Sequence, residues 1–131
     1  METNDTNGKI IYKELSYRLN GLLFGLHNLL GRYCREKQYE DALEKILKEN
    51  NINYVREKSL PIDMVDNQHT NKADFVIEDK IIFELKSKPL ITREDYSQMQ
   101  RYLQASGYKL GLLVNFRSKY LKPIRIIRFN S

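Results

Sequence analysis

The sequence predicts an α/β fold built on a mixed β-sheet, with helices on both faces of the sheet. Three observations support this prediction. Apolar residues recur at helical spacing in the first fifty residues, three strand-like segments follow, and another helical segment separates these from two last strands. A three-strand meander followed by a helical crossover and further strands gives a mixed sheet that is covered on both sides.

Leucines carry the helical pattern of the first segment. They recur at spacings of four and three, at Leu15, Leu19, Leu22, Leu26 and Leu29. This spacing predicts a helix over about residues 9–30, and Gly31 is suited to end it because glycine tolerates a left-handed cap. A second helix is predicted over residues 35–49, because its apolar side chains share one face. Those side chains are Tyr39, Leu43, Ile46 and Leu47.

The middle of the chain is predicted to form three strands. They cover residues 53–63, 74–77 and 81–86, and the polar stretch 65–71 is predicted as a loop. Pro61 favours an edge position for the first strand, because proline lacks the N–H group that a central strand needs. The second and third strands form a hairpin.

The last third of the chain is predicted as helix, strand, strand. Thr92 with Asp95 three residues later is a helix start of the capping-box type, and Gly107 ends that helix. Its predicted inner face holds Tyr96, Met99 and Leu103. Residues 110–114 form a near-continuous apolar run, typical of a strand covered on both faces, and residues 124–129 supply the last strand.

An acidic pair and a lysine lie on the central hairpin. Asp74 begins one apolar run, and Glu84 and Lys86 close the next. Because side chains alternate along a strand, Glu84 and Lys86 share a face. A three-residue loop centred on Asp79 places Asp74 opposite Glu84 on that face, whereas a two-residue loop sends the carboxylates to opposite faces. A site here therefore requires an odd-length loop or a bulge.

These residue types suit one chemistry. Hard divalent cations such as Mg²⁺ prefer oxygen ligands, usually one or two carboxylates with waters and phosphate. A lysine beside them can orient or deprotonate an attacking water, and this set is the minimum for metal-assisted phosphodiester hydrolysis. The structural alternative is an ion pair of Lys86 with Glu84 or Asp74 that does no catalysis.

The composition indicates one domain over residues 9–131, after a flexible N-terminus over residues 1–8. No apolar run reaches the roughly 18 residues that indicate a membrane span, and the polar start lacks the apolar core of a signal peptide. Cys34 is the only cysteine, which excludes an internal disulfide and fits a reducing compartment. A cytoplasmic location is therefore expected.

Basic charge is concentrated toward the C-terminus. The net charge is +5, and residues 96–131 hold seven basic residues and no acidic one. Charge runs of this kind are often only solvated surface. The functional alternative is a surface that faces nucleic-acid phosphates, and the residues predicted to make this contact are Arg117, Lys119 and Lys122.

Five segments together resemble the GxxExxY protein family, a small-domain branch of the PD-(D/E)XK nuclease-like superfamily. They cover residues 27–31, 36–43, 72–86, 98–103 and 111–116, and the resemblance extends over about residues 15–127. It implies a restriction-endonuclease-like fold and a nuclease that hydrolyses phosphodiester bonds of DNA or RNA. The cofactor that it implies is Mg²⁺ or Mn²⁺.

The resemblance also implies roles for residues of the hairpin. Asp74 and Glu84 would ligate the metal, helped by the backbone carbonyl of Leu85. Lys86 would act on the attacking water.

Two helix residues complete the implied site. Glu36 would be the helix-borne acid that completes the metal shell or orients the lysine, and Gln98 the polar residue that leans over the site from the later helix. Their structural alternatives are a helix N-terminal acid and an ordinary exposed residue. The chain departs from the family after Gly31, where Arg32 and Tyr33 replace the usual Pro-Gly.

Three functions remain open at this stage. The first is an active nuclease, for which a homodimer is conceivable because cutting both strands needs two sites. The second is a nucleic-acid-binding domain that keeps the fold and does not cut, which predicts salt-dependent binding without metal-dependent cleavage. The third is a protein-interaction domain, which predicts no affinity for nucleic acid at physiological salt.

Overall fold

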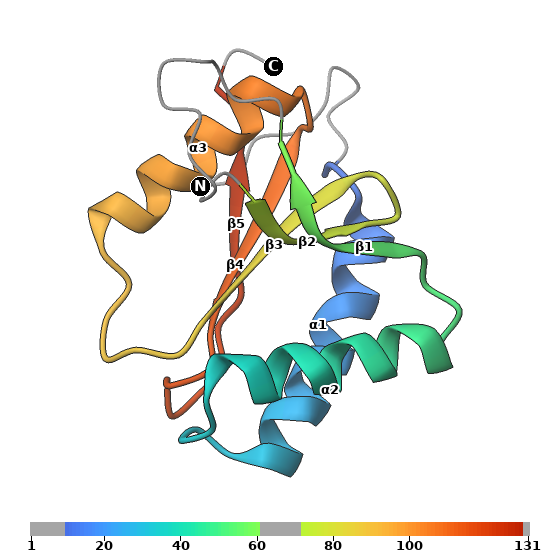
Figure 1. Cartoon of the computed structure of the whole chain (residues 1–131), viewed down its shortest axis with the longest axis vertical. Coiled ribbons are helices and arrows are strands. Elements are labelled where there is room, and N and C mark those ends of the chain that lie inside the picture. Colours follow the sequence, from blue (N-terminus) through green and yellow to red (C-terminus); the bar gives the residue numbers. More distant parts are fainter. Residues whose placement is uncertain (1–9, 61–71, 130–131) are drawn as a thin grey trace.

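The computed structural model describes residues 10–60 and 72–129. Its elements follow the predicted order of helix, helix, three strands, helix and two strands (Figure 1). They are α1 (Lys13–Leu30), α2 (Glu36–Glu49), β1 (Tyr54–Ser59), β2 (Lys72–Ile77), β3 (Ile81–Lys86), α3 (Arg93–Ser106), β4 (Leu110–Asn115) and β5 (Ile124–Ile127).

The five strands form one mixed sheet, in the order β1-β2-β3-β4-β5. The pair β3·β4 is parallel, and the other three pairs are antiparallel. Helix α3 is the crossover between the two parallel strands, as the sequence predicts. Strand β1 lies at an edge, which is the position that Pro61 favours, although Pro61 itself lies outside the described residues.

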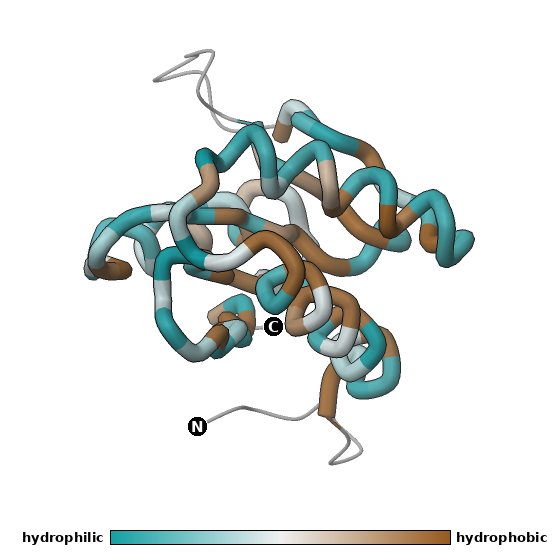
Figure 2. The backbone as a smooth tube through the Cα atoms, turned by 90° about the horizontal axis from the view of Figure 1, so that it is seen from below, coloured by the Kyte–Doolittle hydropathy of each residue, from teal (hydrophilic) through white to brown (hydrophobic). Residues whose placement is uncertain are grey.

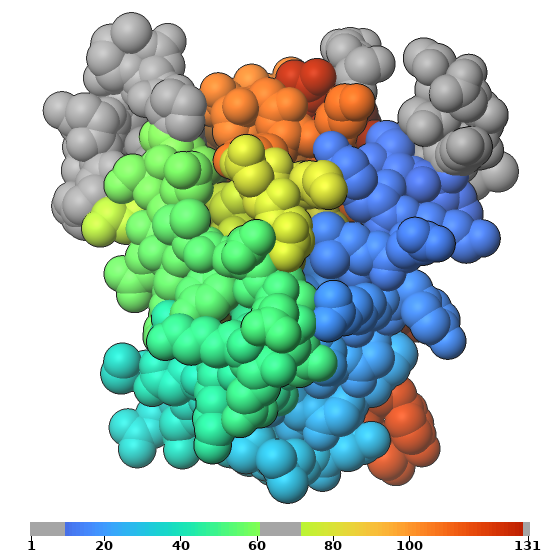
Figure 3. Space-filling view, turned by 90° about the vertical axis from the view of Figure 1, so that its right-hand side faces the viewer, coloured from blue at the N-terminus to red at the C-terminus, as the bar shows by residue number. Residues whose placement is uncertain are grey.

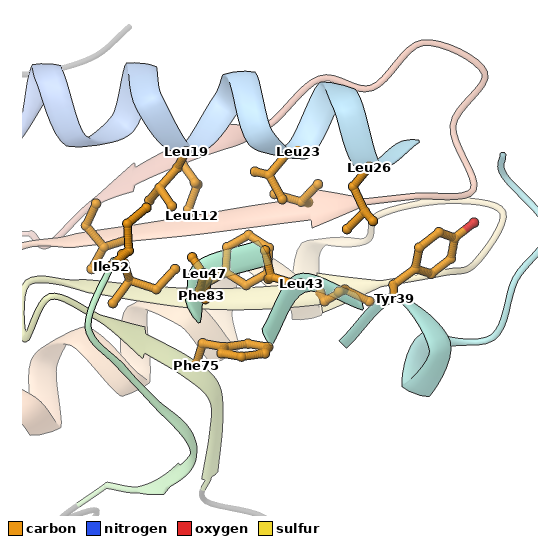
Figure 4. Packing of buried hydrophobic residues seen from close by; sticks show 14 of the residues in the cluster. Leu19, Leu23, Leu26, Tyr39, Leu43, Leu47, Ile52, Phe75, Phe83 and Leu112 are labelled. Atoms are coloured by element: carbon orange, nitrogen blue, oxygen red, sulfur yellow. The ribbon is translucent and has the colours of Figure 1, made fainter. Parts of the chain in front are cut away.

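The helices lie on both faces of the sheet. Figure 1 shows α1 and α2 on one side and α3 on the other. The first core lies between α1, α2 and the sheet, and Figure 4 shows its residues pointing toward one another. They include Leu19, Leu23, Leu26, Leu43, Leu47, Phe75, Phe83 and Leu112. The second core packs α3 on the sheet and includes Met99, Tyr102, Leu103, Val76 and Ile82. Hydrophobic segments accordingly gather in the interior in Figure 2.

Leu29 and Tyr96, which the sequence patterns assign to the core, are exposed. Leu29 is 79% exposed and Tyr96 is 42% exposed, whereas Leu23 and Tyr102 are buried. At about 100° per residue, Leu29 lies about 80° around the helix from Leu19 and about 60° from Leu26, so it falls on the flank of α1. Tyr96 lies in the first turn of α3, at the end of the helix that extends past the strands in Figure 1.

Gly111 marks a close approach between α3 and β4. A Cβ atom at this position would overlap Met99 Sδ and would lie only 2.9 Å from Met99 Cε, and Met99 is itself buried. We expect Gly111→Ala to lower the free energy of unfolding by about 1–3 kcal/mol, because overpacking a well-filled core costs that much. Urea unfolding followed by circular dichroism measures the change.

The matched control is Gly21→Ala in α1. A Cβ at Gly21 meets nothing within 4 Å, and alanine favours a helix interior over glycine by about 0.5–1 kcal/mol. This substitution should therefore stabilise the protein. Equal stability of the two alanine variants would show that the contact between Gly111 and Met99 imposes no packing constraint.

Candidate active site

The hairpin of β2 and β3 has the register that a shared site requires. Phe75 pairs with Phe83, and Ile77 pairs with Ile81. The loop therefore holds three residues and is centred on Asp79, and both Glu78 and Asp79 adopt positive φ (55° and 52°). Extending this register places Asp74 opposite Glu84, so the structure confirms the geometry on which the predicted site depends.

The carboxylates of Asp74 and Glu84 connect β2 and β3 where the backbone pairing of these strands has ended. Pairing of β2 with β3 ends at Phe75 and Phe83, whereas β3 continues beside β4 as far as Lys86. Beyond Phe75 and Phe83, hydrogen bonds from backbone N–H groups to the side chains of Asp74 and Glu84 connect the two strands. The Asp74 N–H group donates to Glu84 Oε2 (2.7 Å), and the Leu85 N–H group donates to Asp74 Oδ2 (2.8 Å). Each carboxylate is thus oriented by a backbone donor on the opposite strand.

Burial raises the pKa of both carboxyl groups. Glu84 is only 5% exposed, and its pKa is raised first by burial and then by the charge of Asp74. The pKa of Asp74 is also raised, with burial as the largest cause. A buried and a half-buried carboxylate placed together disfavour their charged forms unless a cation lies beside them. The pair therefore has the electrostatic character of a cation site.

Lys86 lies between this pair and α3. Its charge lowers the pKa of both Asp74 and Glu84, against the effect of burial. Its Nζ atom is 3.8 Å from Asp95 Oδ1, and Lys88 Nζ is 2.6 Å from Asp95 Oδ2. The ammonium group of Lys86 is therefore close to the carboxyl pair but is also oriented by a buried acid of α3.

Helix α2 brings two acids toward the hairpin. Glu36 is exposed, and its Oε2 accepts the N–H group of Ser87, just past the end of β3 (3.2 Å). Glu40 lies one turn further along and is half-buried, and its charge raises the pKa of both Asp74 and Glu84. Glu36 acts on Asp74 more weakly. Of these two acids of α2, Glu40 therefore has the larger electrostatic effect on the carboxyl pair. The sequence pattern did not single out Glu40.

Gln98 lies on the face of α3 that is turned to the site. Asp95 and Tyr102 are three residues before it and four after it, and such spacings share one helix face. Asp95 contacts Lys86, and burial followed by the charge of Glu84 raises the pKa of Tyr102 to about 12. Gln98 is half-buried between them. It makes no hydrogen bond to another residue that the structure describes.

The basic residues of the C-terminal third differ in their exposure and contacts. Lys119 and Lys122 are exposed, and Arg117 is half-buried. Arg125 instead ties β5 to α1, because its guanidinium donates to Ser16 Oγ (2.5 Å) and to the carbonyl oxygen of Ile11 (2.6 Å). Of the three residues predicted to bind nucleic acid, Lys119 and Lys122 are therefore on the surface, whereas Arg117 also donates to the carbonyl oxygen of Ser87.

Asn115 holds the backbone beyond β3 and is a further residue that the sequence patterns missed. Its side chain accepts the N–H group of Lys88 (3.2 Å) and donates to the carbonyl oxygen of the same residue (2.8 Å). This pair of hydrogen bonds fixes the chain next to Lys86. Only its position at the end of a buried strand, beside the parallel strand β3, could have pointed to it.

Two carboxylates, those of Asp74 and Glu84, are linked across the end of the hairpin. Over residues 10–60 and 72–129, no three His, Cys, Asp or Glu side chains gather as a metal site. Mg²⁺ is commonly bound through one or two carboxylates plus waters and substrate phosphates, so the carboxyl pair fits such an ion.

None of the helices within residues 10–60 and 72–129 has the length and apolar character that a membrane span requires.

The fold and the carboxyl pair on the hairpin define a nuclease-like α/β domain. A family model described as PD-(D/E)XK nuclease superfamily matches residues 13–128. The chain therefore belongs to the PD-(D/E)XK nuclease superfamily, which confirms the superfamily indicated by the sequence. The narrower GxxExxY assignment stays a prediction. A comparison with curated proteins gave no significant match.

Two crystal structures are similar to this chain. That of SSO0001 has a TM-score of 0.52 and 24% sequence identity, and the match covers 89% of this chain and 57% of that one. The alkaline exonuclease (LHK-Exo) from Laribacter hongkongensis has a TM-score of 0.47 and 14% identity, with 67% of this chain and 53% of the exonuclease covered. The chain thus spans little more than half the length of either structure, and its likeness to SSO0001 concerns the fold alone.

Proposed function

We propose that this domain hydrolyses phosphodiester bonds of DNA or RNA with a divalent cation, Mg²⁺ or Mn²⁺. The observation that carries the proposal is the carboxyl pair of half-buried Asp74 and buried Glu84, which are hydrogen-bonded across the end of the hairpin and accompanied by Lys86. Membership of the PD-(D/E)XK nuclease superfamily supports it.

Asp74 and Glu84 would hold the cation, with the carbonyl oxygen of Leu85 as a further ligand. One oxygen of each carboxylate accepts a backbone N–H group. In the described part of the chain no hydrogen bond reaches Asp74 Oδ1 or Glu84 Oε1, so one oxygen of each remains for an ion. When bound, the cation would supply an acidified water and positive charge against the phosphate.

The other residues would position the reactants. Lys86, oriented by Asp95, would hold or deprotonate the attacking water, and Gln98 and Glu36 would tune the site from the two helices. Arg117, Lys119 and Lys122 would bind the phosphate backbone. A homodimer is proposed only for cleavage of both strands of a duplex, and the cytoplasmic location stays a prediction from the sequence.

The test is a cleavage assay with purified protein, Mn²⁺ and labelled DNA and RNA of several structures. Wild type should cut at least one substrate, and EDTA should stop it. Lys86→Gln should lower the rate by about a hundredfold or more, since positioned proton transfer contributes about 10²–10⁴.

Lys109→Gln is the matched control for this assay. Lys109 is an exposed lysine next to the start of β4, at the opposite end of the β3·β4 pair from Lys86. This variant should cut like wild type. Binding without any cleavage would instead identify a non-catalytic nucleic-acid-binding domain.

A further inference from the structure

We infer that Tyr33, with the guanidinium groups of Arg32 and Arg117 beside its ring, is a stacking site for an unpaired nucleotide next to the active site. These three residues are called the Tyr33 site below. The inference rests on the proposed function for the class of ligand and goes beyond it in naming single-stranded nucleic acid as the form that binds.

The side chain of Tyr33 is exposed, and the guanidinium groups of two arginines lie near its ring. The residue is 74% exposed. The Cζ atom of Arg32 lies 5.1 Å from its ring centroid, and that of Arg117 lies 5.6 Å away. Both distances lie within the roughly 6 Å of a cation–π contact, and the exposure of the residue shows that much of its surface still faces solvent. A nucleobase can stack on the ring while the guanidinium groups reach the adjoining phosphates.

The loop that carries Tyr33 is held in place before any ligand binds. The buried hydroxyl of Tyr39 donates to the carbonyl oxygen of Gly31 (2.5 Å) and accepts the N–H group of Cys34 (3.2 Å). Its ring stacks on Phe116 with a centroid distance of 4.3 Å. In Figure 4 the Tyr39 hydroxyl points away from the leucine cluster. A preorganised loop reduces the entropy lost on binding.

The loop after β4 is fixed to the same place. Arg32 Nε donates to the carbonyl oxygen of Arg117 (2.8 Å), and His27 Nε2 lies 2.9 Å from the carbonyl oxygen of Ser118. Figure 3 shows this loop, in red-orange, beside the light-blue end of α1. Two segments about 85 residues apart in the chain therefore form one rigid surface.

The Tyr33 site adjoins the proposed catalytic residues. Arg117 Nη2 donates to the carbonyl oxygen of Ser87 (3.4 Å), and Ser87 Oγ donates to that of Cys34 (3.1 Å). Ser87 directly follows Lys86 and is three residues from Glu84, a span of about 10 Å along an extended chain. A base held by Tyr33 would leave its backbone within reach of the carboxyl pair.

The charge of the surface suits a phosphate chain. Residues 31–37 and 116–123 together contain six basic residues and one acidic residue, Glu36, whose carboxylate accepts the N–H group of Ser87. Bases in a duplex are stacked on each other, and extruding one costs a few kcal/mol. An exposed tyrosine with flanking arginines therefore favours a strand whose bases are already unpaired.

Fluorescence anisotropy with the full chain in EDTA tests the inference without relying on catalysis. Three labelled DNA ligands are compared: a short single strand, the same strand with abasic residues, and a matched duplex. Wild type should bind the ordinary single strand at least about fivefold more tightly than the abasic strand, since stacking on one aromatic ring contributes that much or more. It should also prefer the single strand to the duplex.

Tyr33→Ala should remove the difference between the ordinary and abasic strands, and Tyr33→Phe should keep it. Tyr17→Ala is the control, because Tyr17 is equally exposed (82%) on α1 but lies 14 residues before Gly31, about 21 Å along the helix. It should behave as wild type.

The inference is overturned if Tyr33→Ala still distinguishes the two strands as wild type does, or if wild type prefers the duplex. Its failure is separable from that of the proposed function. Absence of Mn²⁺-dependent cleavage by wild type, together with loss of base-dependent binding in Tyr33→Ala, would remove the nuclease proposal and keep the Tyr33 site.

Discussion

Glu84→Gln is expected to stabilise the metal-free protein and to abolish its nuclease activity. Burial, followed by the charge of Asp74, raises the pKa of Glu84, so its carboxylate is costly when no cation is bound. The amide keeps the shape, and its oxygen can still accept the Asp74 N–H group. We expect the free energy of unfolding to rise by about 2–4 kcal/mol at about pH 8, the cost of one desolvated charge without a partner.

The direction of this change in the free energy of unfolding follows from its dependence on pH. Because the folded pKa of Glu84 is raised above its ordinary value of 4.5, the folded group keeps a proton at pH values where the unfolded group has lost it. The folded state then binds more protons, so the free energy of unfolding falls as pH rises from about 4.5 through the folded pKa. Thermal denaturation in EDTA across this range should show wild type and Glu84→Gln diverging as pH rises.

The nuclease activity of Glu84→Gln should fall although its stability rises. Loss of one proposed metal ligand is expected to lower Mn²⁺-dependent cleavage by at least about a hundredfold, since a bound cation contributes several kcal/mol of charge stabilisation. The combination of higher stability and lower activity is expected of a site that is built for a ligand rather than for the fold.

Glu44→Gln is the matched control for this pair of effects. Glu44 accepts hydrogen bonds from Tyr54 (2.6 Å) and Arg56 (2.9 Å), and these bonds lower its pKa. Its neutralisation should therefore destabilise the protein and leave cleavage unchanged. If Glu84→Gln proved less stable than wild type at about pH 8, the carboxyl pair would be satisfied without a cation and the metal proposal would lose its main support.

The sequence predicted the hairpin because strand alternation is a local pattern, but it left the length of the loop open, which the structure shows to be three residues. Strand alternation and a three-residue turn together determine which side chains oppose each other, and Asp74, Glu84 and Lys86 follow from that register. The element order is similarly local, since Gly31, Thr92 and Gly107 all lie at the helix ends that their residue types favour.

The rest of the site depends on how helices are placed against the sheet, which no local pattern specifies. Asp95 is recognisable as a cap residue, and it does accept the Thr92 N–H group (2.7 Å). Its second role, contacting Lys86 and Lys88, arises only because the crossover brings the start of α3 beside the end of β3. Glu40 was missed for the same reason, because its position over the hairpin is set by the packing of α2.

Arg56→Met is expected to be the most destabilising exchange outside the apolar core. Arg56 on β1 reaches three carboxylates of α2, with distances of 3.1 Å to Glu40, 2.8 Å to Asp41 and 2.9 Å to Glu44. The side chains of Arg56 and Glu40 are each only 17% exposed. Removing the cation leaves three acids facing one another, so we expect the free energy of unfolding to fall by about 3 kcal/mol, measured by urea denaturation.

A double-mutant cycle separates this repulsion from lost packing, because the Arg56 stem also lies against Phe75, with Cζ 5.8 Å from the ring centroid. Adding Glu40→Gln to Arg56→Met should recover part of the loss, because it neutralises one of the three acids that then face one another. Lys37→Met is the control, since Lys37 pairs with Asp41 at 3.9 Å but is 80% exposed, and such pairs contribute only about 0–1 kcal/mol. If Arg56→Met cost no more than Lys37→Met, the Arg56 network would not be what docks α2 on β1, and the placement of Glu40 beside the carboxyl pair would need another cause.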